Sequence, residues 1–73
     1  MIEFRVHLKM AEKKWRIKDL AEHANIGRDT VSRYYHGRVS AIEVDVLNKI
    51  CKALNCQPGD LLVYVPEEKE DGE

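Results

Sequence analysis

The chain has 73 residues, a length sufficient for one small domain and no more. Its formal net charge is −1, and 34% of its residues are charged. This balance excludes a uniformly basic, histone-like protein and a strongly acidic one, and a hydrophobic content of 44% is that of a globular protein. No apolar run approaches the ~20 residues that a membrane-spanning helix needs, and the charged start MIEFRVHLKM lacks a signal-peptide core, so we expect a cytoplasmic protein.

The first predicted elements are a short strand and a helix. Residues 2–4 alternate apolar and charged side chains, too briefly for a strand that is stable alone. A helical period then runs from about residue 4, with Val6 and Met10 on one face and Ala11 beside them. Trp15 follows as an apolar anchor between this helix and the next.

A second helix is predicted over residues 17–24. Its apolar side chains fall on one face, which comprises Ile17, Leu20, Ala21 and Ala24. Arg16 stands where a side-chain cap would be, so we expect this helix to begin without one. Asn25 tolerates the left-handed conformation that ends a helix, and Gly27 precedes a new start.

A third helix is predicted over residues 28–36, ended by Gly37. Val31 and Tyr34 are three residues apart and must face the core. The opposite side is entirely polar and consists of Arg28, Asp29, Ser32, Arg33 and His36.

The fourth helix is expected to open at Ser40, because residues 40–43 match a capping box in which Glu43 reaches back. It runs to about residue 54 and stops at Asn55. Its expected core face comprises Val44, Leu47, Ile50, Cys51 and Leu54.

Residues 56–62 are expected to form a short fifth helix, with Pro58 in its first turn and Asp60 suited to the positive helix N-terminus. Residues 63–65 then form a strand that pairs either with residues 2–4 of the same chain or with another subunit.

The last seven residues, 67–73, hold five acids and one base, so the other 66 residues carry 11 bases and 8 acids, a net charge of +3. We therefore expect a domain over residues 1–66 and an acidic, disordered tail, which either keeps the protein soluble or competes with an anionic ligand.

The chain offers no metal, cofactor or catalytic site. Cys51 and Cys56 provide no disulfide framework, and with the three histidines they form no paired metal-ligand spacing. Cys51 is expected to be a buried free thiol. A Gly-rich phosphate loop and a nucleophile–base pair are both missing from the sequence, so we expect neither an enzyme nor a cofactor.

Residues 17–36 meet the requirements of a helix-turn-helix. Ala21 is small where the two helices would cross, Asn25 can take positive φ, and apolar residues lie before, within and after the turn. Each requirement is common, but all of them within about 20 residues are typical of a DNA-binding motif.

The polar face of the second helix of this motif supplies the candidate base contacts. Arg28 and Arg33 are favoured, because arginine donates two hydrogen bonds to guanine O6 and N7. Asp29 accepts from cytosine N4 or orients one of these arginines. Thr30 and Ser32 are short donors suited to a phosphate or a base edge.

Residues 17–37, with the sequence IKDLAEHANIGRDTVSRYYHG, resemble the phage-repressor-like (Cro/cI, or xenobiotic-response-element) helix-turn-helix family. Residues 47–56 and 59–62 resemble the fourth and fifth helices of that family, and the likeness covers roughly residues 4–66. The resemblance implies an all-α, five-helix, lambda-repressor-like domain. It also implies a homodimer on pseudo-palindromic double-stranded DNA and a role in transcriptional regulation.

The resemblance also implies residue roles. Arg28, Asp29 and Arg33 fall at base-contacting positions, and Thr30 at a position that contacts a base or a phosphate. The positions implied for phosphate contact are Arg16, Lys18, Gly37 and Arg38. Tyr35, at the margin of the polar face, either packs partly or contacts a phosphate through its hydroxyl. Ile17 departs from the family, in which many members carry a phosphate-contacting Gln.

A charge of +3 is weak for one DNA-binding module, so we expect a dimer, at least on DNA. The alternative is a protein-interaction module, an antitoxin or adaptor, that retains the helix-turn-helix as a scaffold. It would use the tail or the edge of residues 63–65 to bind a protein partner.

Overall fold

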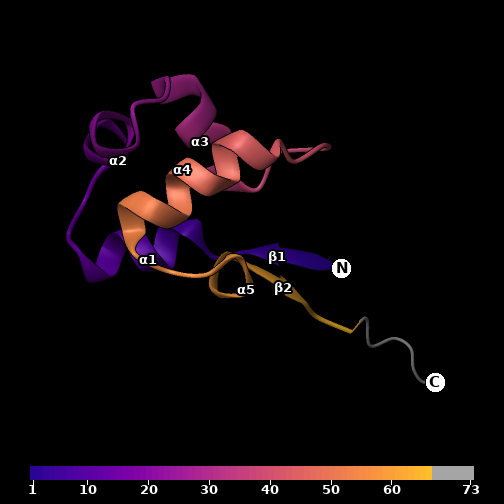
Figure 1. The fold of residues 1–73 in the computed structure, drawn as a ribbon. Helices are drawn as coiled ribbons and strands as arrows, with labels where there is room; N and C mark the ends of the chain where they lie inside the picture. Colours follow the sequence, from indigo (N-terminus) through magenta and orange to yellow (C-terminus); the bar gives the residue numbers. More distant parts are fainter. Residues whose placement is uncertain (67–73) are drawn as a thin grey trace.

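The computed structural model describes residues 1–66, which contain five helices and a two-stranded sheet. In chain order the elements are β1 (Ile2–Phe4), α1 (Val6–Glu12), α2 (Ile17–Ala24), α3 (Arg28–His36), α4 (Val44–Leu54), α5 (Pro58–Leu61) and β2 (Leu62–Tyr64) (Figure 1). The prediction of a five-helix fold is confirmed. None of these helices has the length and apolar character needed to cross a membrane. The predicted acidic tail, residues 67–73, lies outside the described residues.

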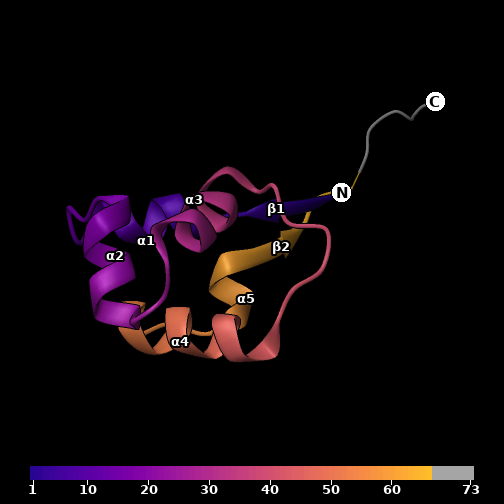
Figure 2. The same cartoon turned by 90° about the horizontal axis from the view of Figure 1, so that it is seen from above.

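The helices enclose one apolar core. Seen from above, α4 lies along one side, α1 and α3 along the other, and α2 closes one end (Figure 2). Every helix contributes at least one side chain that is almost fully buried, and each such aliphatic side chain stabilises the fold by about 1.5–3 kcal/mol. The core residues are Val6, Met10, Leu20, Ala21, Ala24, Val31, Tyr34, Ile50, Leu54 and Leu61.

Left-handed residues end the first four helices. Asn25, Gly37 and Asn55 have φ angles of 58°, 70° and 54°, as the sequence predicted, and Lys14 has a φ of 58°. At each end the next amide N–H folds back onto a carbonyl of the last turn, as in the bond of 3.1 Å from Ile26 to Ala21. These reversals keep the connections short and place successive helices at sharp angles.

As predicted, the side chain of Arg16 does not cap the start of α2, but Asp19 reaches back to it from inside the helix. The backbone N–H of Arg16 donates to Asp19 Oδ2 at 2.8 Å. The guanidinium of Arg16 has no acceptor to return this bond, so Asp19 supplies only the reaching-back half of a capping box. At the start of α5, Asp60 does the same for the N–H of Gln57, at 2.9 Å.

The predicted capping box at residues 40–43 is wrong, because α4 begins at Val44. Glu43 is extended, with φ −88° and ψ 127°, and its N–H donates to the hydroxyl of Tyr34 at 3.3 Å. Ile42 packs against the core in this extended segment. Val44, expected in the core, is 81% exposed, and Val46 packs there instead.

The two ends of the chain pair with each other, which confirms the intramolecular alternative. β1 and β2 are antiparallel, with Phe4 opposite Leu62 and Ile2 opposite Tyr64. The pairing extends to Met1 and Val65, whose backbone groups exchange two hydrogen bonds of 2.8 Å. Beside the sheet the start of α1 meets the end of α5, where the N–H of Arg5 donates to the carbonyl of Leu61 at 2.7 Å.

Candidate nucleic-acid interface

Two helices and a three-residue turn build the centre of the candidate site. α2 and α3 pack against each other, and Ala21, which is 6% exposed, provides the small side chain that the close approach of α2 to its neighbours requires. Asn25 reverses the chain, and Gly27 is extended and starts α3, its carbonyl accepting from the N–H of Val31 at 3.1 Å. This is a helix-turn-helix.

α3 buries one face and exposes the other. Val31 is fully buried and Tyr34 is 3% exposed, and these two side chains fix the rotation of the helix about its own axis. The predicted polar side therefore faces solvent: Arg28, Asp29, Arg33 and His36 are exposed and Ser32 is half-buried. Thr30 and Tyr35 are half-buried at the two flanks.

A contact within α3 orients one of the arginines. Arg33 Nη2 lies 3.4 Å from Thr30 Oγ1 and donates to it. The sequence predicted Asp29 as one candidate to orient an arginine. Among residues 1–66, however, the side chain of Asp29 makes no ion pair or hydrogen bond. Its carboxylate is left open to an external donor.

A hollow of about 570 Å³ lies between the start of α2 and the side of α3. Four of the predicted contact residues line it, namely Arg16, Lys18, Arg28 and Tyr35. The rest of its wall consists of Trp15, Ile17 and His36, which were not among the predicted contact residues. Three positive side chains around one opening make it suitable for a phosphate group.

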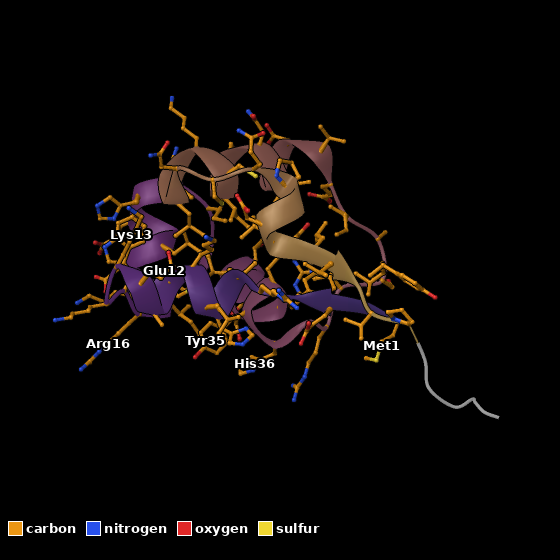
Figure 3. All side chains as sticks on the ribbon, turned by 90° about the horizontal axis from the view of Figure 1, so that it is seen from below. Met1, Glu12, Lys13, Arg16, Tyr35 and His36 are labelled. Carbon is orange, nitrogen blue, oxygen red and sulfur yellow. The ribbon has the colours of Figure 1, made fainter. Side chains whose placement is uncertain are left out.

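Two aromatic contacts fix Tyr35 beside this hollow. Its ring meets those of His7 and His36 edge-on, at centroid distances of 5.8 and 5.0 Å. Tyr35, His36 and Arg16 project from the same side of the molecule (Figure 3). Tyr35 is therefore partly packed, as one of the two alternatives predicted, and it also lines the hollow.

The remaining predicted contacts lie at the C-terminal end of α3. Gly37 is left-handed, and a Cβ built on it would lie 3.5 Å from the ring of Phe4. Arg38 is exposed and follows directly. Neither residue lines the hollow, although Gly37 directly follows His36, which does.

The five predicted basic contact residues share one property. Within the described residues none of them is paired with a carboxylate, whereas Arg5, Lys9 and Lys49 are paired, with Glu3, Glu12 and Asp45. Their charges are thus available to an external anion. The five are Arg16, Lys18, Arg28, Arg33 and Arg38.

Trp15 was not predicted as a site residue, because its apolar character predicted only packing, and Ile17 was predicted only as a departure from the phosphate-contacting Gln of many family members. Ile17 does pack against the core, and Trp15 stacks on His23 with 4.2 Å between ring centroids and 22° between planes. The sequence signal for their position was indirect. They flank Arg16, which the resemblance had placed at a phosphate.

Comparison with known proteins agrees with this geometry. Residues 5–67 match the model of the Cro/C1-type HTH DNA-binding domain family. An uncharacterized HTH-type transcriptional regulator of Bacillus subtilis (strain 168), YozG, is 36% identical over 63 residues, which cover 86% of this chain and 75% of YozG. The crystal structure of a candidate DNA-binding protein from Bacteroides fragilis superposes with a TM-score of 0.70 at 30% identity and covers 86% of this chain and all of that one.

Proposed function

This chain belongs to the Cro/C1-type helix-turn-helix family of DNA-binding transcriptional regulators, and from this premise we propose that it reads a specific DNA sequence with α3 in the major groove. An α-helix fits that groove. The observation that carries the proposal is the exposed polar face of α3, on which Arg28 and Arg33 have no carboxylate partner among residues 1–66. The domain over residues 1–66 is the proposed binding unit.

Base recognition falls to three exposed residues of this face. Arg28 and Arg33 donate to guanine O6 and N7, and Asp29 accepts from cytosine N4. The bond of 3.4 Å from Arg33 to Thr30 favours one position of the guanidinium before DNA arrives. Ser32 lies on the same face and reaches a base edge or a phosphate.

Residues on one side of α3 and at its C-terminal end contact the DNA phosphate backbone. At one side Arg16, Lys18 and Tyr35 line the hollow, where a DNA phosphate would neutralise the two positive charges. At the end of the helix the exposed Gly37 and Arg38 meet a second phosphate. Ile17, which replaces the glutamine of many relatives, leaves this task to the cations beside it.

We propose that the protein binds DNA as a homodimer. A net charge of +3 over residues 1–66 gives one domain little attraction for DNA. Two recognition helices spaced about 34 Å apart would contact successive major grooves of a pseudo-palindromic site. The matched family does not favour the alternative of an antitoxin or adaptor that binds only protein.

The test is a binding titration on a duplex selected from a random pool. Arg33→Ala is expected to weaken binding to the selected duplex by about 5- to 150-fold, the equivalent of about 1–3 kcal/mol, and to relax the preference at one base pair. Arg28→Ala is expected to act at a different base pair.

Lys52→Ala is the matched control, because Lys52 is an exposed cation of α4 outside the proposed contacts. Lys18→Ala should weaken selected and random duplexes alike and reduce the salt dependence by about one ion. If both arginine variants bind the selected duplex as the Lys52→Ala variant does, α3 does not read the sequence.

A further inference from the structure

The C-terminal end of α4 brings two cysteines together. Asn55 is left-handed. The N–H of Cys56 donates to the carbonyl of Cys51 at 3.0 Å, and the N–H of Asn55 donates to the carbonyl of Lys52 at 3.3 Å. These two bonds define a Schellman motif, in which the side chains of the first and last residues meet across the turn. The residues at these two positions are usually apolar, and here both are cysteines, whose side chains interact with each other.

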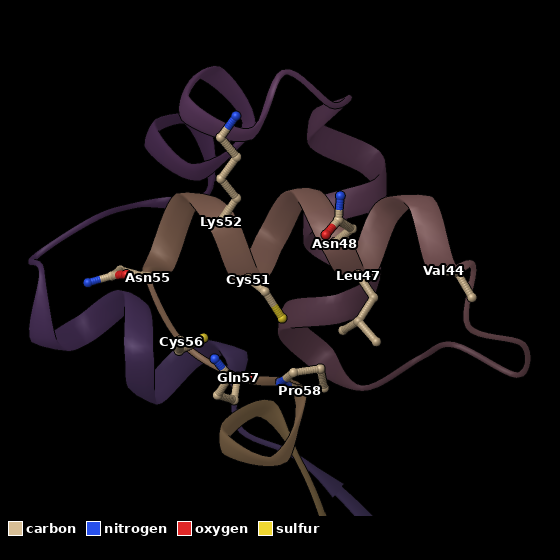
Figure 4. A pocket seen from close by; sticks show the side chains of 9 residues that line it. All are labelled: Val44, Leu47, Asn48, Cys51, Lys52, Asn55, Cys56, Gln57 and Pro58. Carbon is tan, nitrogen blue, oxygen red and sulfur yellow. The ribbon is translucent and has the colours of Figure 1, made fainter.

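Both thiols are free, half-buried and open to the same space. They line a hollow of about 440 Å³ beside α4 (Figure 4). Its other walls include Leu47, Lys52 and Pro58. A small reagent can therefore reach the pair without unfolding the helix, and Lys52 offers a positive charge to an anionic one.

The electrostatics agree with this proximity. Burial raises the pKa of the Cys51 thiol and of the Cys56 thiol, and after burial the largest influence on each is the other cysteine. Both thiols therefore remain mainly protonated at neutral pH. Because the thiolate is the reactive form, the two cysteines react slowly.

We propose that Cys51 and Cys56 form a dithiol site that closes to an intramolecular disulfide by exchange with a small anionic disulfide such as oxidised glutathione. One cysteine thiolate attacks a sulfur of the reagent, which forms a mixed disulfide and releases one glutathione. The second cysteine attacks the protein sulfur of the mixed disulfide and releases the other glutathione. Two protein thiols are oxidised, one small disulfide is reduced to two thiols, and no further oxidant is required.

The disulfide is expected to be easily reversed. It closes a loop of only a few residues within one turn, so it restricts the unfolded chain far less than a long-range cross-link does. Reduced glutathione in excess should therefore reopen it. This behaviour is that of a responsive site and differs from that of a structural disulfide.

The experiment treats the full chain with oxidised glutathione and follows free thiols and intact mass. The wild type should lose both thiols, with a mass change of two hydrogens and no glutathione attached, at a rate independent of protein concentration. Cys51→Ser and Cys56→Ser, checked by circular dichroism, should instead each accumulate a stable glutathione adduct, because no second thiol displaces it.

The wild-type result alone decides the matter, whether or not the variants fold. A persistent glutathione adduct on the wild type, a disulfide-linked dimer, or two thiols that remain free would each overturn the proposal. None of these readouts involves DNA, so they are independent of the proposed function.

Discussion

Tyr34 connects the recognition helix to two distant parts of the chain. Its ring is 3% exposed and meets the ring of Phe4 edge-on at a centroid distance of 6.3 Å. Its hydroxyl accepts from the N–H of Glu43 at 3.3 Å. One side chain thereby ties α3 to β1 and to the start of α4, so the orientation of the proposed reading face depends on it.

Tyr34→Phe tests the hydroxyl while it keeps the ring. The N–H of Glu43 loses its acceptor in a partly buried place, so the free energy of unfolding should fall by about 1 kcal/mol. Urea denaturation followed by circular dichroism measures this change. Tyr64→Phe is the matched control, because Tyr64 is 66% exposed and its change should stay within about 0.5 kcal/mol. Equal stabilities of the two variants would show that the Tyr34 hydroxyl contributes nothing.

At the level of elements, the turn between α2 and α3 was predicted from a few residue types. The left-handed conformation of Asn25, the buried Ala21 and the burial of Val31 all agree with the pattern in the sequence. These features are local, since each depends on residues within a turn or two of the helix. The left-handed Lys14 was not predicted, because lysine has no special preference for that conformation.

Asn25 also offers a test of this turn. At φ 58° and ψ 49°, Asn25→Ala should lower the free energy of unfolding by about 1 kcal/mol, because the Cβ of alanine disfavours the left-handed conformation. Asn25→Gly should be close to the wild type, since glycine adopts that conformation freely. Thermal unfolding of the two variants side by side gives the comparison. If alanine and glycine are equally tolerated, the left-handed residue does not limit the stability of the turn.

The start of α4 shows what a local pattern misses. Residues 40–43 match a capping box, yet the helix begins at Val44. Ile42 packs into the core and Glu43 is held by the Tyr34 hydroxyl, so tertiary contacts outweigh a cap that stabilises by about 1 kcal/mol. Because α4 begins at Val44, Val46 packs against the core and Val44 is exposed to solvent.

For the molecule as a whole, the sequence predicted that the polar side chains of α3 face solvent, but it did not predict how they are arranged beside residues of α2. The polar face of α3 follows from helical periodicity alone. The hollow shared by Arg16, Lys18 and Arg28 does not, because it depends on the angle at which α2 meets α3. The pairing of β1 with β2 joins residues more than 50 positions apart. Because this pairing also depends on the tertiary arrangement, the sequence did not decide whether the last strand pairs within the chain or with another subunit.

The charge of the whole chain leads to the last prediction. Residues 1–66 carry a net charge of +3 and residues 67–73 carry −4, so removal of residues 67–73 should raise the affinity for random DNA several-fold at low salt. The gain should shrink as salt rises, because the screening length falls from about 30 Å at 0.01 M to about 10 Å at 0.1 M. Filter binding at both salt concentrations measures it.

A full-length variant separates charge from bulk. Replacing the five acids of residues 67–73 by their amides keeps the length of the chain, so it should match the truncated protein at low salt if repulsion of phosphate is the cause. If only truncation raises the affinity, the segment obstructs DNA by its size. If neither change does, the cations on and beside α3 act independently of the acids that follow the domain, and the near-zero total charge of the chain carries no functional meaning.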